Sequence, residues 1–309
     1  MKTDRPLRKT RYRSLIQRLL LIGCLSLAPL SARAASTINP ANQYAWGANI
    51  GWTVWRSSAA DGVSIGEFIC SGYIYGANVG WINVGDGTPA NNIQYQNNSA
   101  TDFGLNYGID PTQPGVAVLR GFAYGANIGW INFEATGNPR LSLFTGTFSG
   151  YAYSANCGWI NLNDALGKVQ TDNVAMGVDS DGDGIADAFE FQFFGNLTTA
   201  SPTSDADGDG VSDRDEYLDG TSPTIPTDRL CITAFSTNPG GTSSPITWTS
   251  TTARLYVIET NPDLFSAWVP DPTFGVAFAP DAGTSTMRTI TSASATKRFF
   301  RVRAIRPLP

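Results

Sequence analysis

Alternating aromatic and small residues over residues 40–165 predict β-hairpins. One pattern occurs in four copies, each with aromatics at every second position, a turn of small residues with Asn, and an exit that begins Gly-Trp. The copies begin at Tyr44, Gly72, Gly121 and Gly150. Their tryptophans, which are 29, 49 and 29 residues apart, are Trp52, Trp81, Trp130 and Trp159. This recurrence predicts a repeat domain over residues 40–177.

Further alternating runs flank these copies. Strand patterns precede the second, third and fourth copies in residues 63–70, 116–119 and 140–148. Residues 168–178 alternate in the same way, and we expect them to pair back onto the first copy, because a closed array removes exposed sheet edges. Residues 97–113 are rich in Asn, Gly and Pro and are predicted to form a loop.

Residues 228–306 carry short strand patterns at the spacing of a β-sandwich. The patterns lie at residues 230–235, 246–249, 255–259, 276–278, 288–291 and 299–302. Arg301 and Arg303 alternate with apolar residues, which predicts a solvated face opposite a buried one; a basic stripe that binds a cell-surface polymer is the alternative. The predicted fold class is mainly β, with an N-terminal β-hairpin repeat domain, a short Asp-rich connector of loops and helices, and a C-terminal β-sandwich.

The connector, residues 178–227, contains two twelve-residue segments with the spacing of a calcium loop. Both have carboxylates at positions 1, 3, 5, 9 and 12 and a glycine at position 6, where the chain must turn sharply. A backbone carbonyl at position 7 completes the ligand set. The predicted ligands are Asp179, Asp181, Asp183, Ile185, Asp187 and Glu190 in the first loop, and Asp205, Asp207, Asp209, Val211, Asp213 and Glu216 in the second. A solvated acidic linker is the plainer alternative, but it does not explain why both segments repeat the glycine and the glutamate.

Short helices are predicted after each loop, at residues 186–194 and 212–218. Each helix carries the glutamate of position 12. Four phenylalanines within residues 189–194 are too apolar for a free linker, so we expect them to pack against each other or against a neighbouring domain.

Three motifs resemble known families. The D-x-D-x-D-G-x-x-D pattern of both loops resembles the thrombospondin type 3 repeat, whose loops bind calcium. The repeat in residues 43–162 resembles the G-Y-A-W-S-E-N-x-G-W-I repeats of bacterial exported proteins. Ile246-Thr247-Trp248-Thr249 and Phe299-Phe300-Arg301-Val302-Arg303 resemble fibronectin type III-like C-terminal modules. These resemblances imply a calcium-binding bacterial surface protein and name no substrate.

The first 34 residues predict a secretory signal peptide. A basic start is followed by an apolar run over residues 19–30 and by Ala32-Arg33-Ala34, the small-residue pattern of a cleavage site. Lipoprotein anchoring at Cys24 is the less favoured alternative, because the apolar run continues past that cysteine. No later segment is apolar enough to span a membrane. Without residues 1–34 the chain has 13 basic and 25 acidic residues, which argues against a nucleic-acid partner.

The chain contains no histidine, which excludes Ser-His-Asp and Cys-His catalysis and most zinc or iron sites. The carboxylates of the repeat do not recur from copy to copy, so we expect no enzyme, with a glycosidase-like carboxylate pair as the remaining alternative. Cys70 and Cys157 occupy apolar repeat positions and are interpreted as core residues, with a disulfide between them as the alternative.

The four tryptophans permit two interpretations. In the favoured one they fill the core, while Asn49, Asn78, Asn127 and Asn156 bond the backbone of their own turns. In the other, Trp52, Trp81, Trp130 and Trp159 stack on the sugars of a glycan in a carbohydrate-binding module. The function predicted from the sequence is an exported, calcium-binding structural or adhesion protein at the surface of a bacterium, whose calcium stiffens the connector between two β-domains. No feature of the sequence indicates an oligomeric state.

Overall fold

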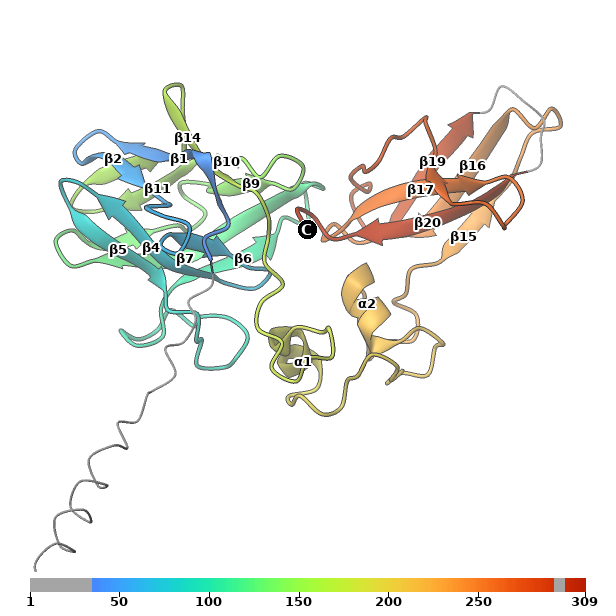
Figure 1. Cartoon of the computed structure of the whole chain (residues 1–309), viewed down its shortest axis with the longest axis horizontal. Coiled ribbons are helices and arrows are strands. Elements are labelled where there is room, and N and C mark those ends of the chain that lie inside the picture. The colour runs from blue at the N-terminus through green and yellow to red at the C-terminus, as the bar shows by residue number, and fades with distance from the viewer. Residues whose placement is uncertain (1–34, 292–297) are drawn as a thin grey trace, which may run out of the picture. The chain divides into compact units, whose positions relative to one another are not determined.

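The computed structural model describes residues 35–291 and 298–309, which form one compact unit. The predicted signal peptide and Cys24 lie outside the described residues. The fold is mainly β, as predicted, and the described residues include two short helices (Figure 1). Separate clusters of buried apolar side chains lie in the repeat, in the connector and in the C-terminal region.

The four repeat copies fold into four antiparallel hairpins with matching registers. Trp46 faces Trp52 in the first hairpin, and Tyr75, Tyr124 and Tyr153 face the tryptophans of the other three. The hairpins are β1 (Ile38–Gly47) with β2 (Gly51–Val54), β4 (Cys70–Gly76) with β5 (Gly80–Gly85), β7 (Val116–Gly125) with β8 (Gly129–Asn132), and β11 (Tyr151–Ser154) with β12 (Gly158–Asn161).

These eight strands close into a ring. Neighbouring hairpins pair through β2 with β4, β5 with β7, and β8 with β11, and β12 then returns to β1 through the pair Trp46 and Asn161. Every strand of the ring therefore has a partner on both sides. Closure satisfies the backbone groups that an open array would leave at its edges.

Shorter strands extend the ring at one end. They are β3 (Val63–Ile65), β6 (Leu105–Ile109), β9 (Arg140–Ser142), β10 (Phe148–Ser149), β13 (Asn163–Asp164) and β14 (Gly167–Thr171). β14 pairs with β1, which confirms the predicted return to the first copy. The predicted strands at residues 63–70 and 140–148 are each interrupted by a turn.

The prediction of a loop throughout residues 97–113 is wrong, because β6 lies within it and pairs along β7. Leu105 and Tyr107 are buried on either side of the half-buried Asn106. This short alternation was hidden by the Asn, Gly and Pro residues around it.

The buried face of the ring consists of small and aliphatic residues, and the aromatic residues lie on the outside. Ala45, Ile74, Ala123 and Ala152 are at most 3% exposed, whereas Trp81, Trp130 and Trp159 are 51%, 45% and 46% exposed. Trp52 is half-buried. The expectation that these tryptophans fill the core is therefore wrong. The core tryptophan of the repeat is Trp55, which is 1% exposed and packs on Phe133 and Phe148.

Cys70 and Cys157 are buried free thiols, so the core interpretation holds and the alternative disulfide is not formed. Burial raises the pKa of the Cys70 thiol to about 12, which makes it unreactive at neutral pH.

The C-terminal region is a sandwich of two three-stranded sheets. One contains β15 (Ile232–Phe235), β16 (Ser243–Thr249) and β19 (Ser285–Thr291); the other contains β18 (Val269–Pro270), β17 (Leu255–Asn261) and β20 (Phe299–Ile305). Trp248, Ile290, Tyr256 and Ile258 come from both sheets and share one core.

One expectation about the sandwich needs correction. Residues 276–278 do not form a strand; Phe278 makes only a bridge to Tyr256. Arg301 and Arg303 lie on the exposed face of β20, as predicted, and both pair with Glu259, at 2.6 and 3.2 Å.

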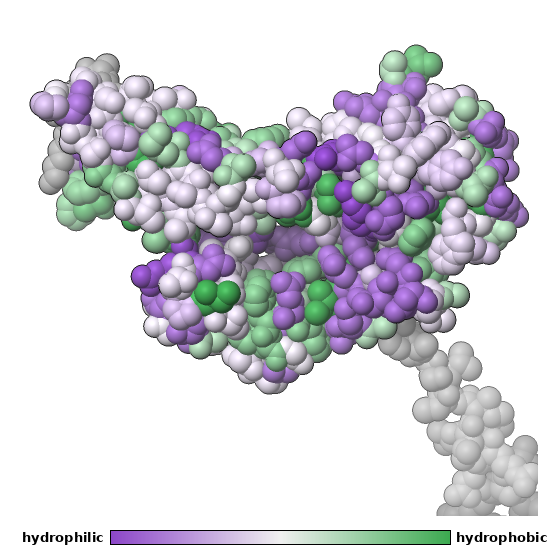
Figure 2. Space-filling model, turned by 180° about the vertical axis from the view of Figure 1, so that it is seen from behind, coloured by the Kyte–Doolittle hydropathy of each residue, from purple (hydrophilic) through white to green (hydrophobic). Residues whose placement is uncertain are grey.

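Residues of intermediate hydropathy cover much of the face drawn in Figure 2, with strongly hydrophilic and strongly hydrophobic residues in smaller groups between them. Only 15% of the residues are charged, and 13 of the 26 acidic residues lie between residues 178 and 228. Negative charge is therefore concentrated in the connector. Neither of the described helices is long and apolar enough to cross a membrane.

Candidate metal centres

Each Asp-rich loop is folded by its first aspartate and its central glycine. Asp179 accepts hydrogen bonds from the backbone N–H groups of Gly182 and Gly184, at 2.8 and 3.0 Å. Asp205 accepts the equivalent bonds from Gly208 and Gly210, at 2.8 and 2.9 Å. The glycines at position 6, Gly184 and Gly210, have φ values of 87° and 93°, in the left-handed region that favours glycine. The two loops therefore share one backbone conformation.

This conformation brings the predicted carboxylates together. In each loop, one oxygen from each of the first three aspartates lies within 4.8 Å of the others. The two groups are Asp179, Asp181 and Asp183, and Asp205, Asp207 and Asp209. Like charges repel at this distance, and each group could hold one shared cation.

The buried glutamates at position 12 are a second, independent observation that favours a cation in each loop. Glu190 lies on α1 (Asp187–Phe193) and Glu216 on α2 (Asp213–Asp219), and both are 0% exposed. Among residues 35–291 and 298–309, neither oxygen of Glu190 has a hydrogen-bond partner, nor has Oε2 of Glu216. A buried carboxylate without partners is costly unless a cation compensates it.

The surroundings of both glutamates disfavour their charged forms. Burial, followed by the neighbouring Asp181 and Asp183, raises the pKa of Glu190 to about 7. Burial, followed by Asp207 and Asp209, raises the pKa of Glu216 to about 8. The carboxylates that raise these pKa values are other predicted ligands of the same loop, so each glutamate lies near the aspartates of its loop.

The carboxylates at position 9 accept hydrogen bonds from residues of their own loops. Asp187 accepts hydrogen bonds from the backbone N–H and the hydroxyl of Ser180, at 2.7 and 2.6 Å. Asp213 accepts from the hydroxyl of Ser204 and the backbone N–H of Ala206, at 2.5 and 3.0 Å. Both oxygens of each aspartate thus hold the loop against its helix, so these residues position the site.

The residues at position 7, the predicted carbonyl ligands, are hydrogen-bonded within their loops through their backbone N–H groups. Ile185 and Val211 each donate a backbone N–H to the preceding aspartate, both at 2.8 Å. The Ile185 side chain is fully buried in the connector core, which fixes this part of the loop.

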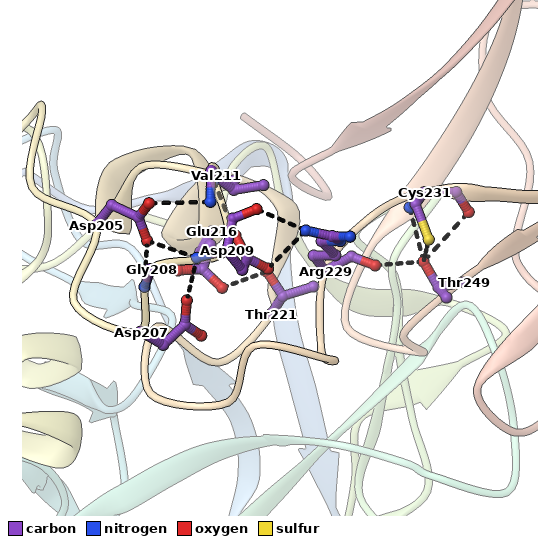
Figure 3. A network of polar contacts seen from close by, with 11 residues as sticks. Asp205, Asp207, Gly208, Asp209, Val211, Glu216, Thr221, Arg229, Cys231 and Thr249 are labelled. Carbon is purple, nitrogen blue, oxygen red and sulfur yellow. Dashed lines mark hydrogen bonds and ion pairs between the residues drawn. The ribbon is translucent and has the colours of Figure 1, made fainter.

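The second loop is joined to the sandwich through Arg229, which the sequence reasoning missed. Its guanidinium donates to the backbone carbonyl of Asp209 at 2.6 Å and lies 3.6 Å from the Asp209 carboxylate. The Arg229 carbonyl accepts from the Thr249 hydroxyl of β16 (Figure 3). A base directly after an acidic stretch was the available sequence signal.

The helix that follows the second loop contacts both β regions. Tyr217 of α2 donates its hydroxyl to Glu67 of the repeat at 2.6 Å, and Arg306 donates to the other oxygen of Glu67 at 2.6 Å. Arg254 of the sandwich donates to the carbonyls of Tyr217 and Leu218, at 2.6 and 2.7 Å. These partners lie 37 residues or more from Tyr217, so sequence spacing does not indicate them.

Apolar packing joins the first helix to the same place. The Phe189 ring lies 4.6 Å from Phe193 and 5.1 Å from Tyr217, and Phe68 and Met176 of the repeat pack on this cluster. The expected packing of the phenylalanines is confirmed. Both Asp-rich loops therefore lead into one shared core.

The donor set fits calcium. All ligand candidates are oxygens from carboxylates and a backbone carbonyl, the ligands of a hard cation, and no histidine or thiol stands among them. The unpartnered buried oxygens of Glu190 and Glu216 are the atoms that a bound ion would satisfy.

The predicted sugar-stacking residues lie apart from these centres, on the outside of the ring. Each tryptophan packs in its own hairpin against two aromatic residues, one with ring centroids 4.8–5.0 Å away and one at 6.1–6.3 Å. The four copies therefore present four similar aromatic groups.

The asparagines of the turns join one hairpin to the next. Each donates its side-chain amide to a backbone carbonyl of the neighbouring hairpin, and not to its own turn as expected. The bonds run from Asn49 to Cys157, from Asn78 to Ile50, from Asn127 to Val79 and from Asn156 to Ile128, at 3.0–3.2 Å. Together these four hydrogen bonds link the turns of all four hairpins in a closed circle.

Comparison of the chain with protein-family models, with curated proteins and with solved structures gave no match. The assignment of function therefore rests on the geometry of these sites.

Proposed function

We propose that this chain is an exported, non-enzymatic structural or adhesion protein of a bacterial surface, in which two calcium ions fix the connector between the repeat and the sandwich. The observation that carries the proposal is the pair of buried glutamates with unpartnered carboxylate oxygens, each in a loop with three converging aspartates. The location at the cell surface rests on the signal-peptide pattern of residues 1–34.

Calcium supplies positive charge to each group of carboxylates. The predicted holders are Asp179, Asp181, Asp183 and Glu190 in the first loop, and Asp205, Asp207, Asp209 and Glu216 in the second. The carbonyls of Ile185 and Val211 complete the two sets. Without the ion, mutual repulsion favours open loops. Extracellular calcium modules of this kind bind with dissociation constants on the order of 10⁻⁴–10⁻³ M, which matches the calcium concentration outside cells.

Residues of this chain carry the effect of the second loop to the two β regions. Glu216 precedes Tyr217 on α2, so a loop that closes on Glu216 also fixes the tyrosine that donates to Glu67. Arg229 holds Asp209 to the sandwich, and Arg254 binds the last carbonyls of the same helix. Calcium thus stabilises the contacts through which the second loop and α2 join the repeat to the sandwich.

Limited proteolysis with trypsin tests this function. Arg214 is the one Lys or Arg between residues 178 and 228, and it is exposed on α2. We expect millimolar calcium to slow cleavage after Arg214 at least tenfold relative to chelator, because cleavage requires local opening of the helix. The Glu216→Gln variant should be cleaved rapidly in both conditions. Equal cleavage of the natural chain with calcium and with chelator would contradict the proposal.

A carbohydrate-binding function of the repeat is the second candidate. It is favoured by the half-exposed Trp81, Trp130 and Trp159, which a core role would have buried. Aromatic groups on a rigid sheet are suited to stack on sugar rings, which have an apolar face and polar edges.

A further inference from the structure

The third hairpin differs from the other three because a loop folds over its tryptophan. Residues 97–99 and Phe103 of this loop, together with Phe122 and Trp130, line a pocket of about 360 Å³. This volume lies at the lower end of the range for small-molecule sites. The ring contacts of Trp52, Trp81 and Trp159 all lie within their own hairpins, whereas Trp130 also contacts Phe103.

The loop is rigidly held. Asp102 is buried and accepts backbone N–H groups of Ala90 and Gln96, at 3.3 and 3.2 Å. Asn97 accepts from the Gly104 N–H at 3.1 Å and donates to the Tyr95 carbonyl at 3.3 Å. The two ends of the pocket-lining segment are therefore fixed, so the pocket is formed before a ligand arrives.

The pocket combines aromatic walls with an unused amide. Phe103 stands edge-on to Trp130, with ring centroids 5.0 Å apart and planes at 87°, and Trp130 remains 45% exposed. Asn98 is exposed, and its side chain has no hydrogen-bond partner within the part of the chain that the structure describes. No charged side chain lines the pocket.

We propose that this pocket binds one neutral sugar residue of a glycan, which stacks on Trp130 and hydrogen-bonds to the Asn98 amide. The uncharged lining disfavours acidic or basic ligands, and the mixture of aromatic rings with an amide suits a ligand that has an apolar face and hydroxyl edges. The inference rests on the second candidate function and assigns its site to the third copy.

The repeat provides a matched control for this assignment. Trp159 occupies the same hairpin position as Trp130, has nearly the same exposure (46% against 45%), and makes the same two intra-hairpin contacts. It has no ring contact equivalent to Phe103 among the described residues. If binding requires the pocket, substitution of Trp130 should weaken it more than substitution of Trp159. If binding uses the aromatic surface in general, the two substitutions should weaken it equally.

The experiment screens the full chain, with calcium present, on an array of neutral and acidic oligosaccharides, and then titrates the best neutral oligosaccharide by calorimetry. We expect Trp130→Ala to weaken binding at least tenfold, Asn98→Ala about threefold or more, and Trp159→Ala less than twofold. Asn98→Ala keeps the test valid if Trp130→Ala fails to fold, because the exposed Asn98 side chain makes no hydrogen bond to the described residues that the substitution would remove.

Three results would overturn the proposal, and they have different meanings. Equal losses for Trp130→Ala and Trp159→Ala, with no effect of Asn98→Ala, would place binding on the aromatic surface and leave the second candidate function intact. Retention of acidic oligosaccharides alone would refute the neutral-sugar pocket but not the carbohydrate function. Retention of no oligosaccharide would refute both.

Discussion

Replacing Tyr217 by Phe tests whether calcium binding at the second loop is coupled to the contact between α2 and the repeat. The substitution removes only the hydroxyl that donates to Glu67 at 2.6 Å. The ring, which is 1% exposed and packs 5.1 Å from Phe189, remains in place. Burial and the nearby Glu67 raise the pKa of Tyr217, so the hydroxyl stays protonated and remains a donor.

The expected loss follows from the charge of the acceptor. A hydrogen bond to a charged group contributes roughly 1.5–3 kcal/mol. Glu67 keeps the contact to Arg306, which reduces the penalty of the lost donor, so we expect about 1.5 kcal/mol. If the bond forms only when the second loop has closed, its loss makes the free energy of calcium binding to the second site less favourable by the same amount, because coupling between sites is reciprocal. The affinity of the second site for calcium should then fall about tenfold.

The assay is a calcium titration of the Glu190→Gln variant, in which only the second site remains, with and without Tyr217→Phe. Tyr256→Phe is the control: Tyr256 is also 1% exposed, but its oxygen accepts from the Thr251 N–H within the sandwich. We expect this control to lower stability without changing calcium affinity. An unchanged affinity in Tyr217→Phe would show that the contact between Tyr217 and Glu67 is independent of the metal and would refute the proposed coupling.

Two further predictions concern the repeat. Gly80→Ala should destabilise the chain by about 1–2 kcal/mol in urea unfolding, because Gly80 has φ +77° and a Cβ there would lie 3.4 Å from the Asn127 amide. Gly108→Ala, where φ is not positive and the nearest atom is 3.6 Å away, should change stability by about 0.5 kcal/mol or less; equal losses would contradict the role of the left-handed turn. Trp55→Ala, a core substitution, should lower the free energy of unfolding by about 3–5 kcal/mol. Trp81→Ala, at a half-exposed position, should lower it by less than half of that. The reverse order in the same urea assay would mean that the outer aromatic residues form the core.

The hairpins were predictable because local signals define them. Alternation, the small-residue turn and the Gly-Trp exit all describe single hairpins, and the structure has all four of them. Alternation shows that a strand has two different faces but does not show which face is buried. In the closed ring the inner positions belong to Ala45, Ile74 and their equivalents, so the larger aromatic residues lie outside. The aliphatic residue after the tryptophan in copies two to four, as in Ile82, was the signal for this arrangement.

The Asp-rich loops were predictable for a related reason. Their predicted ligands come from twelve consecutive residues, so spacing alone brings Asp179, Asp181 and Asp183 together. The hydrogen bonds that Asp187 accepts from Ser180 were not predictable, because ligand spacing does not indicate them. Long-range partners carried no local signal: Glu67 and Tyr217 are 150 residues apart in the sequence.

A calorimetric calcium titration of the full chain tests the central claim most directly. The two carboxylate sites predict two bound ions, with dissociation constants on the order of 10⁻⁴–10⁻³ M. Glu190→Gln and Glu216→Gln should each leave one ion bound, since each removes the buried ligand of one loop. A chain that binds no calcium at about 10 mM, or two glutamine variants that still bind two ions, would contradict the account.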